Sequence, residues 1–298
     1  MKKTVAGTLA VGLLLAGFSV AQAQQSPSRA ARVFDTSAEP AYNVSLGLLP
    51  NGKFTNDEHS SIVEINGDWA FAYFWDVLGG DIDLNARLRS FVFTDSAGLE
   101  LPSQVAQAAL NAGWTWRFEH DAGLQLRTLP GIYSDFERLN SRIFYMPVSL
   151  TAGKAFDPRM AGYLGLELRP RFDRLIMPII CLDAQIADPL RLKAGLPESR
   201  LTYQMNKDWS THVGLNWDSL TFTVKDQGDW ERDQMSMEDL RAYWGMKIGL
   251  SDQVRLVGDL GWVFGRTIRF DGGSNANNGV DIDIDSGMFV RFGVEGSY

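Results

Sequence analysis

The sequence predicts an all-β protein, a single closed antiparallel transmembrane β-barrel of about 12 strands, with roughly 10–14 strands possible. Three observations lead to this fold class. Apolar and polar residues alternate with a period of two in segment after segment from Tyr42 onward. Aromatic residues gather at the ends of these segments, and the chain finishes on an alternating segment that ends in Tyr298. Together they indicate a sheet with one apolar and one polar face.

Composition excludes several classes of protein. The chain has 298 residues, of which 45% are apolar and 21% charged, and its formal net charge is −8. The acidic balance argues against a nucleic-acid-binding protein, which would carry a basic patch, and the apolar content is too high for a disordered chain. One Cys and three His cannot supply a disulfide framework or an ordinary structural zinc site. No metal or cofactor is therefore predicted.

The N-terminus has the pattern of a secretory signal peptide. Lys2 and Lys3 precede an uncharged segment that runs from residue 4 to residue 20, and Ala21-Gln22-Ala23 supplies the small-residue cleavage site. We expect residues 1–23 to be the signal peptide, with 24–40 a polar periplasmic lead-in and 41–298 the outer-membrane barrel. An uncleaved membrane anchor is the alternative. No later apolar run reaches the roughly 20 residues that a membrane-spanning helix needs.

Alternation defines the strands in chain order. It is clearest in residues 81–89, where Ile82, Leu84, Ala86 and Leu88 occupy one face and Asp81, Asp83, Asn85, Arg87 and Arg89 occupy the other. Further alternating segments lie at 114–119, 124–127, 163–169, 212–218, 220–225 and 255–264. Turn-rich stretches such as Asp121-Ala122-Gly123 separate them. The window Ser103–Leu110 is the exception, because its Val and Ala spacing is typical of a short helix.

Alternation alone also fits a soluble sandwich, and two features favour the membrane barrel. The polar face carries both signs of charge and many glycines, as the interior of a barrel does. Segment ends carry amphipathic rings such as Trp75, Trp114 and Trp262, which suit a bilayer interface. A strand needs about 9–11 residues to span the bilayer, so the chain has room for about a dozen strands and their loops. The lumen could be plugged, form a narrow pore, or hold a small ligand.

A charged cluster is expected to face the lumen. Asp281, Asp283 and Asp285 have the same alternation phase as Arg291, Gly293 and Glu295, so they are expected to continue the polar face of the last strand. The neighbouring strand offers Arg255, Asp259, Arg266 and Arg269. Pairing between these rows could set ion selectivity or lock the interior. The alternative is a cation bound by the three aspartates, whose spacing only partly follows a calcium loop.

The C-terminal segment carries a family resemblance. Val290, Phe292, Val294 and Tyr298 share one face, and Gly296 stands where a large apolar residue is usual. This segment resembles the terminal strand of Gram-negative outer-membrane β-barrels, in which it is the signal for the barrel assembly machinery and closes the barrel against the first strand. The resemblance implies outer-membrane lipid as surroundings, with periplasmic chaperones and the assembly machinery as partners during biogenesis.

A second resemblance covers most of residues 80–298. The segments Leu129–Phe136, Leu175–Pro178 and Gly195–Tyr203 resemble a family of exported β-barrel proteins of unknown function. It implies the fold and no activity.

Three functions remain open from the sequence. The preferred one is an outer-membrane barrel that serves as a narrow channel or conduit for small solutes or hydrophobic compounds, or as a structural barrel, and is not an enzyme. The second is an outer-membrane lipid hydrolase or deacylase that uses Ser210 and His212, which share one side of a strand. The third is a soluble periplasmic β-protein. The substrate and the oligomeric state are not encoded in any motif of the chain.

Overall fold

The computed structural model describes residues 34, 41–53, 59–94, 101–137, 141–224, 234–271 and 280–297. The predicted signal peptide lies outside these residues, as do Tyr298 and the predicted lead-in apart from Phe34. The described chain is all-β, as predicted, with one short 3-10 turn at Ser141–Ile143. No helix within it combines the length and the apolar character needed to cross a bilayer.

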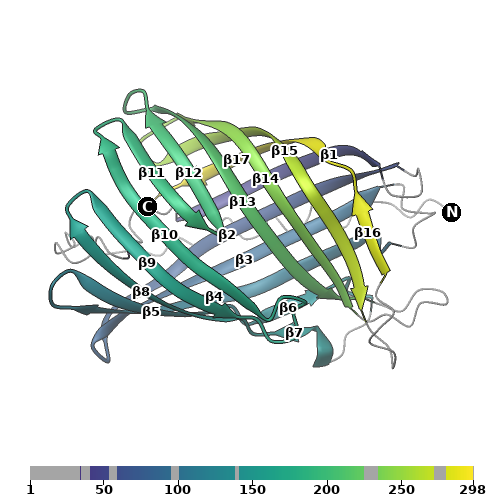
Figure 1. The fold of residues 1–298 in the computed structure, drawn as a ribbon, viewed down its shortest axis with the longest axis horizontal. Coiled ribbons are helices and arrows are strands. Elements are labelled where there is room, and N and C mark those ends of the chain that lie inside the picture. Colours follow the sequence, from purple (N-terminus) through teal and green to yellow (C-terminus); the bar gives the residue numbers. More distant parts are fainter. Residues whose placement is uncertain are drawn as a thin grey trace.

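The strands follow one another along the chain and wind around a common axis (Figure 1). Their bounds are β1 (Tyr42–Lys53), β2 (His59–Val77), β3 (Gly80–Thr94), β4 (Gln104–Phe118), β5 (Ala122–Thr128), β6 (Gly131–Ser134), β7 (Phe144–Tyr145), β8 (Val148–Asp157), β9 (Met160–Leu168), β10 (Ile176–Ala187), β11 (Leu190–Leu196), β12 (Glu198–Gln204), β13 (Trp209–Thr223), β14 (Gln234–Gly249), β15 (Val254–Asp271), β16 (Val280–Ile284) and β17 (Gly287–Gly296).

The sheet closes on itself. β1 pairs with β2 on one side and with β17 on the other, with Tyr42 opposite Gly296 and Leu48 opposite Val290. The result is a closed antiparallel barrel of 14 strands, which confirms the predicted closed barrel and lies at the upper bound of the predicted strand number. β6, β7 and β16 lie beyond this ring, as extensions of the sheet.

The two ends of the barrel differ. At the end that holds Tyr42 and Gly296, the strands are joined by turns of two to four residues; we call it the turn end. The opposite end, which we call the loop end, carries the longer connections, such as 95–103 and 224–233. The wall is also uneven, because β2 has 19 residues and β15 has 18, whereas β11 and β12 have seven each. The long strands project past the short ones at the loop end.

Alternation gives the wall its two faces near the turn end. Leu164, Leu166 and Leu168 of β9 are 65%, 53% and 50% exposed on the outer face. Asp81 and Asp83 of β3 lie on the inner face and are buried. The outer face there is thus a belt of exposed apolar side chains, and the inner face is polar.

The loop end has the opposite arrangement. Its interior is filled by one apolar cluster contributed by strands from around the ring, including Ile62 of β2, Phe91 and Phe93 of β3, Leu220 and Phe222 of β13, Met235 and Met237 of β14, and Ile268 and Phe270 of β15. The rings of Phe91 and Phe222, on strands that are not neighbours, lie 6.1 Å apart. We call this cluster the apolar core; it occupies the lumen as the core of a soluble barrel would.

Two irregularities change which residues face inward at the loop end. In β15 the pairing with β14 gains one residue between Phe264 and Thr267, and Gly265 within this bulge has φ +56°. The bulge places Ile268 and Phe270 in the apolar core. A break at Asp285–Ser286 separates β16 from β17 and reverses the phase of the last strand in the same way.

The window Ser103–Leu110 is not a helix. Residues from Gln104 onward belong to β4, where Ala106, Ala108 and Leu110 alternate with Val105, Gln107 and Ala109. The expectation of a short helix was wrong because a run rich in Ala fits either period. Pairing with β3 along 13 positions, from Gly80–Trp116 to Val92–Gln104, decides in favour of the strand.

Past the end of β12, β13 continues toward the loop end as an edge strand. β12 pairs with β13 only as far as the Glu198–Asn216 pair. One further hydrogen bond runs from Trp217 N to the backbone oxygen of Pro197. Segments from across the barrel cover the remainder: Ser134 of β6 pairs with Thr223, and Asp173, in the connection after β9, donates its N–H to Thr221 Oγ1 at 3.3 Å. Thr221 and Thr223 are consequently 0% and 3% exposed. This seal narrows the ring at the loop end.

Candidate functional site

Charged side chains span the lumen next to the apolar core, on its turn-end side. Six of them form one network, which we call the ion-pair layer: Glu64 of β2, Arg89 of β3, Asp218 of β13, Asp239 and Arg241 of β14, and Arg266 of β15. The strands that supply it lie on opposing parts of the ring. Three arginines therefore meet three carboxylates within the barrel.

Glu64 is the centre of this layer. Its Oε2 accepts a hydrogen bond from Arg241 Nη1 at 2.6 Å, and its Oε1 accepts one from Arg89 Nη2 at 3.2 Å. Arg89 also donates to Asp218. Because Arg241 and Asp218 belong to β14 and β13, these contacts join the wall formed by β2 and β3 to the opposing wall.

The other half of the layer is equally buried. Asp239 accepts from Arg241 Nε at 2.9 Å and from Arg266 Nε at 3.1 Å. Asp239, Arg241 and Arg266 are 5%, 5% and 3% exposed. Ion pairs at this depth are held in low dielectric, and removing one member leaves an uncompensated charge that costs about 3–5 kcal/mol. The layer therefore holds the two walls together.

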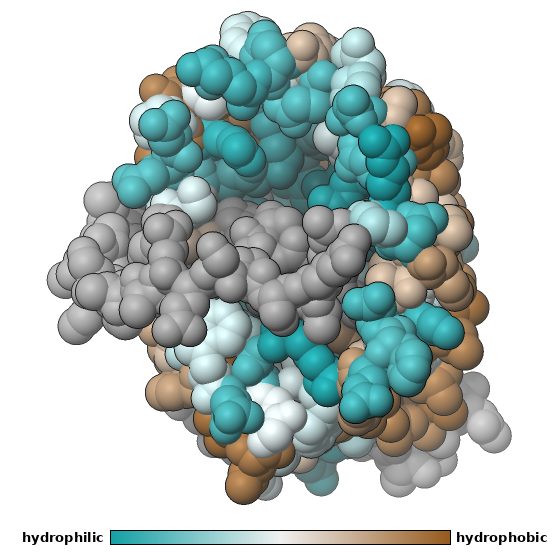
Figure 2. Space-filling view, turned by 90° about the vertical axis from the view of Figure 1, so that its left-hand side faces the viewer, coloured by the Kyte–Doolittle hydropathy of each residue, from teal (hydrophilic) through white to brown (hydrophobic). Residues whose placement is uncertain are grey.

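Closer to the turn end the charged side chains pair along the wall instead of across it. Arg117 pairs with Asp81, Arg127 with Asp83 at 3.2 Å, Lys247 with Glu295 at 2.7 Å, and Arg291 with Asp259 at 2.6 Å. Each pair joins strands that are adjacent or separated by one strand. Figure 2 views this end, which is hollowed and lined by hydrophilic side chains, while the flanks of the wall are hydrophobic. We call the hollow the vestibule.

Phe34 lies in the vestibule. Its ring centroid is 5.4 Å from that of Tyr163 of β9, and its edge is close to Gly123 of β5. Both positions are on the inner face of their strands. The residue thus contacts the inner wall near the turn end.

The predicted charged cluster divides into two groups. Asp259, Arg291 and Glu295 lie on the inner face near the turn end, and Arg255, which is half exposed, is 3.9 Å from Glu295. Asp281 and Asp283 lie elsewhere, on the exposed outer face of β16. The break at Asp285–Ser286 is the reason, because it puts Ile282 and Ile284 on the inner face in their place.

The acidic row has partners of its own on the outer face. Asp281 pairs with Arg269 at 2.7 Å, and Asp283 accepts from Thr267 Oγ1 at 3.0 Å. Arg269 also pairs with Asp173 at 2.9 Å. Asp285 is exposed at the strand break. Across the described residues, no group of three or more His, Cys, Asp or Glu side chains is arranged to hold a metal ion.

The C-terminal strand closes the ring. Val290, Phe292 and Val294 are opposite Leu48, Leu46 and Val44 of β1, so that apolar side chains of both strands lie side by side on the outer face. Tyr298, the last residue of the predicted assembly signal, lies outside the described residues. Recognition of this segment by the barrel assembly machinery stays a prediction.

Ser210 and His212 both lie on the inner face of β13 and are buried. His212 uses Nε2 to contact Asp259 Oδ1 at 2.9 Å, and Asp259 also pairs with Arg291. Among the described side chains, no hydrogen bond joins Ser210 to His212. A nucleophile needs its base within hydrogen-bond reach, so this arrangement gives the hydrolase alternative no support.

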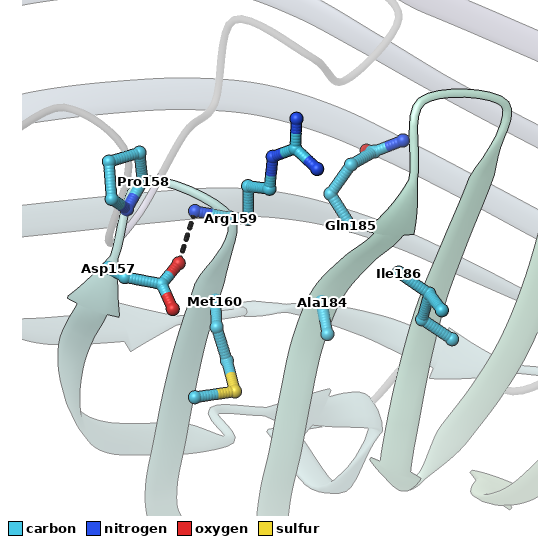
Figure 3. A pocket seen from close by; sticks show the side chains of 7 residues that line it. All are labelled: Asp157, Pro158, Arg159, Met160, Ala184, Gln185 and Ile186. Carbon is cyan, nitrogen blue, oxygen red and sulfur yellow. Dashed lines mark hydrogen bonds between the residues drawn. The ribbon is translucent and has the colours of Figure 1, made fainter.

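A cavity of about 510 Å³ opens on the outside of the wall at the turn end (Figure 3). It lies between the hairpin turns that follow β8 and β10 and is lined by Asp157, Pro158, Arg159, Met160, Ala184, Gln185 and Ile186. Arg159 Nη2 pairs with Asp188 at 3.2 Å, and both side chains are largely exposed. Such a pair is worth at most about 1 kcal/mol, and the cavity is not part of the lumen.

The sequence did not identify the ion-pair layer as a unit. Arg89, Asp218 and Arg266 were recognisable as charges on polar strand faces, but the contacts of Glu64, Asp239 and Arg241 across the barrel depend on which strands oppose each other. The sequence signal that could have indicated this layer is the presence of positive and negative residues at inward-facing positions of several long strands.

No protein-family model matches this sequence, and no curated protein matches it. Solved porin and channel structures are similar at low identity. The NanC porin is 9% identical with a TM-score of 0.41, over 87% of this chain and 100% of that one. The COG4313 outer membrane channel from Pseudomonas putida F1 is 11% identical with a TM-score of 0.43, over 91% and 99%. A mutant of the Rh. blastica porin is 12% identical with a TM-score of 0.24, over 84% and 99%.

Proposed function

We propose that this chain is an outer-membrane β-barrel that conducts small solutes, and that the conformation described here is its closed state. The observation that carries the proposal is the order of contents along the lumen. A polar vestibule at the turn end leads to the ion-pair layer, and the apolar core lies behind it. A barrel that served only as a scaffold would not need a polar vestibule that opens at one end.

The outer face supports insertion in a membrane. Exposed apolar side chains encircle the half of the barrel nearest the turn end, among them Leu46, Leu166, Ile180 and Leu215 at 54%, 53%, 49% and 50% exposure. A soluble periplasmic protein would leave this belt in water, which costs about 25 cal/mol per Å² of apolar surface. The signal-peptide pattern and the alternating C-terminal strand fit export and barrel assembly, with the turn end in the periplasm.

The experiment is conductance of the purified barrel in planar lipid bilayers. We expect infrequent openings of small conductance, because the ion-pair layer and the apolar core must both rearrange before water fills the lumen. Heat-modifiable migration in detergent gels provides the folding control. Complete absence of current from the folded wild-type chain, and also from variants in which the ion-pair layer is weakened, would contradict a channel and leave a structural barrel.

A further inference from the structure

Arg169, at the loop end of β9, is a buried cation with incomplete partners. The side chain is 5% exposed. Its Nη2 donates to the backbone oxygen of Ser219, its Nη1 lies 3.3 Å from Met177 Sδ, and its Nε has no hydrogen-bond partner. Among the described residues, no carboxylate lies within ion-pair distance of it. This contrasts with Arg241 and Arg266, which each pair with a buried carboxylate.

The position of Arg169 in the fold explains only part of this arrangement. Ser219 is on the section of β13 that β12 leaves without a neighbouring strand, so the bond from Nη2 caps an exposed backbone carbonyl. Capping uses one donor. A guanidinium has five donors in a planar fork that matches a carboxylate, and an unpaired buried charge is costly. The unused Nε is adjacent to Nη2 on the same edge of that fork.

A cluster of aromatic side chains begins at the guanidinium, with Phe172 in direct contact with it. Arg169 Cζ lies 4.4 Å from the ring centroid of Phe172. Phe172 contacts Tyr133 and Tyr145, with ring centroids 5.6 and 5.3 Å away, and the two tyrosines are 5.1 Å apart. Gln107, which donates to Tyr133 Oη, has a buried Oε1 without a hydrogen-bond partner. The group is apolar in its body and carries polar edges, which suits an aryl or short alkyl chain.

We propose that Arg169 is the binding residue for the carboxylate of a small amphipathic acid. The carboxylate would accept hydrogen bonds from Nε and Nη2 and replace the Ser219 carbonyl, while the Phe172–Tyr133–Tyr145 rings contact the apolar body of the acid. One guanidinium balances one negative charge, which favours a monocarboxylate over a phosphate dianion. The inference rests on the proposed function, since such an acid would be a solute of the barrel and would reach Arg169 from the lumen.

The test compares 4-phenylbutyrate with 4-phenylbutanamide, which has a similar shape and no charge, by isothermal titration into the full-length barrel in nonionic detergent at neutral pH. We expect the wild-type chain to bind the acid about tenfold or more tightly than the amide, because charge-assisted bidentate bonds are about twice as strong as neutral ones. Arg169→Gln should bind the two compounds equally.

Two further variants sharpen the result. Arg174→Gln removes a cation from the same connection, one that is exposed and pairs with Glu238 at 2.8 Å, and should keep the wild-type preference for the acid. Arg169→Lys keeps the charge and loses the fork, so its preference should be reduced severalfold without disappearing. If Arg169→Gln does not fold, the graded loss in Arg169→Lys decides the question.

Three outcomes would overturn the inference: the wild-type chain binds acid and amide equally, it binds neither, or Arg169→Gln keeps the preference. The channel proposal is tested separately by conductance. Currents without a preference for the acid would support the channel and refute the binding site. A preference that depends on Arg169, seen in a barrel without currents, would support the binding site and refute the channel.

Discussion

Replacing Glu64 by Gln is expected to shift the barrel from its closed to its open state. The carboxylate of Glu64 accepts from Arg241 at 2.6 Å and from Arg89 at 3.2 Å, and these arginines belong to strands on different sides of the lumen. The amide is nearly isosteric but uncharged, and its NH2 group would face arginine donors. The substitution therefore removes the attraction across the lumen and leaves a surplus positive charge in the layer.

The magnitude follows from burial. Glu64 and Arg241 have side-chain exposures of 9% and 6%, which places the pair among buried ion pairs, for which removal of one partner costs about 3–5 kcal/mol. If the arginines are solvated in the open state, this cost falls on the closed state alone. At about 1.4 kcal/mol per factor of ten, a loss of about 3 kcal/mol raises the ratio of open to closed barrels by roughly 150-fold.

Asp68→Asn is the matched control. Asp68 is on the same strand and the same face, but it pairs with Arg87 on the neighbouring strand at 2.7 Å, and the two side chains are 41% and 35% exposed. A pair of this kind contributes about 0–1 kcal/mol. Open probability is measured in planar bilayers at equal protein density. Equal open probabilities for Glu64→Gln, Asp68→Asn and the wild-type chain would refute the role assigned to the ion-pair layer.

Two glycines give further predictions, both measured as the free energy of urea unfolding from lipid vesicles. Gly245→Ala should lower this free energy by about 1–3 kcal/mol, because the added Cβ would lie 2.1 Å from Asp259 Oδ1 and 2.5 Å from His212 Nε2. Gly258→Ala is the control and should cost far less, because the nearest atom to its added Cβ is 3.7 Å away. Equal losses in the two variants would contradict the packing described. Gly265→Ala should cost about 1–2 kcal/mol through φ +56° alone, since nothing lies within 4 Å of its Cβ. Gly265→Asn should cost less, because Asn tolerates this region of φ, and a loss as large as that of Ala would contradict backbone strain as the cause.

Sequence patterns predicted the elements that depend on local alternation. Residues 81–89 lie in β3 with their charged side chains inward, as a period of two requires. The observed 14 strands lie at the upper bound of the predicted range. None of the alternating segments identified in the sequence covers the short strands β11 and β12, which are joined through Pro197 alone.

Contacts that depend on the phase of a strand could not be predicted as well. Asp281 was expected in the lumen because the period-two alternation was counted without interruption through the break at Asp285–Ser286. Gly265 offered a local signal, because glycine inside a strand often marks a bulge. Pairing between Glu64 and Arg241 had none, since two residues 177 positions apart meet only after the ring has closed.

The reversed pattern of the loop end bears on where the barrier to solutes lies. There the inner face is apolar, with Phe222 and Ile268 fully buried, and the outer face carries exposed charges such as Arg269 and Asp281. Charged side chains on a lipid-facing strand are costly near the bilayer midplane, so in the outer-membrane barrel that we propose this half would lie in water and the turn-end half in the bilayer. The ion-pair layer then marks the boundary between the two halves. In that arrangement a solute that has passed the vestibule would already have crossed the lipid, and the apolar core of the water-exposed cap would stop it. Opening of the proposed channel would require the walls of that cap to separate, and Glu64 joins those walls through Arg241 and Arg89.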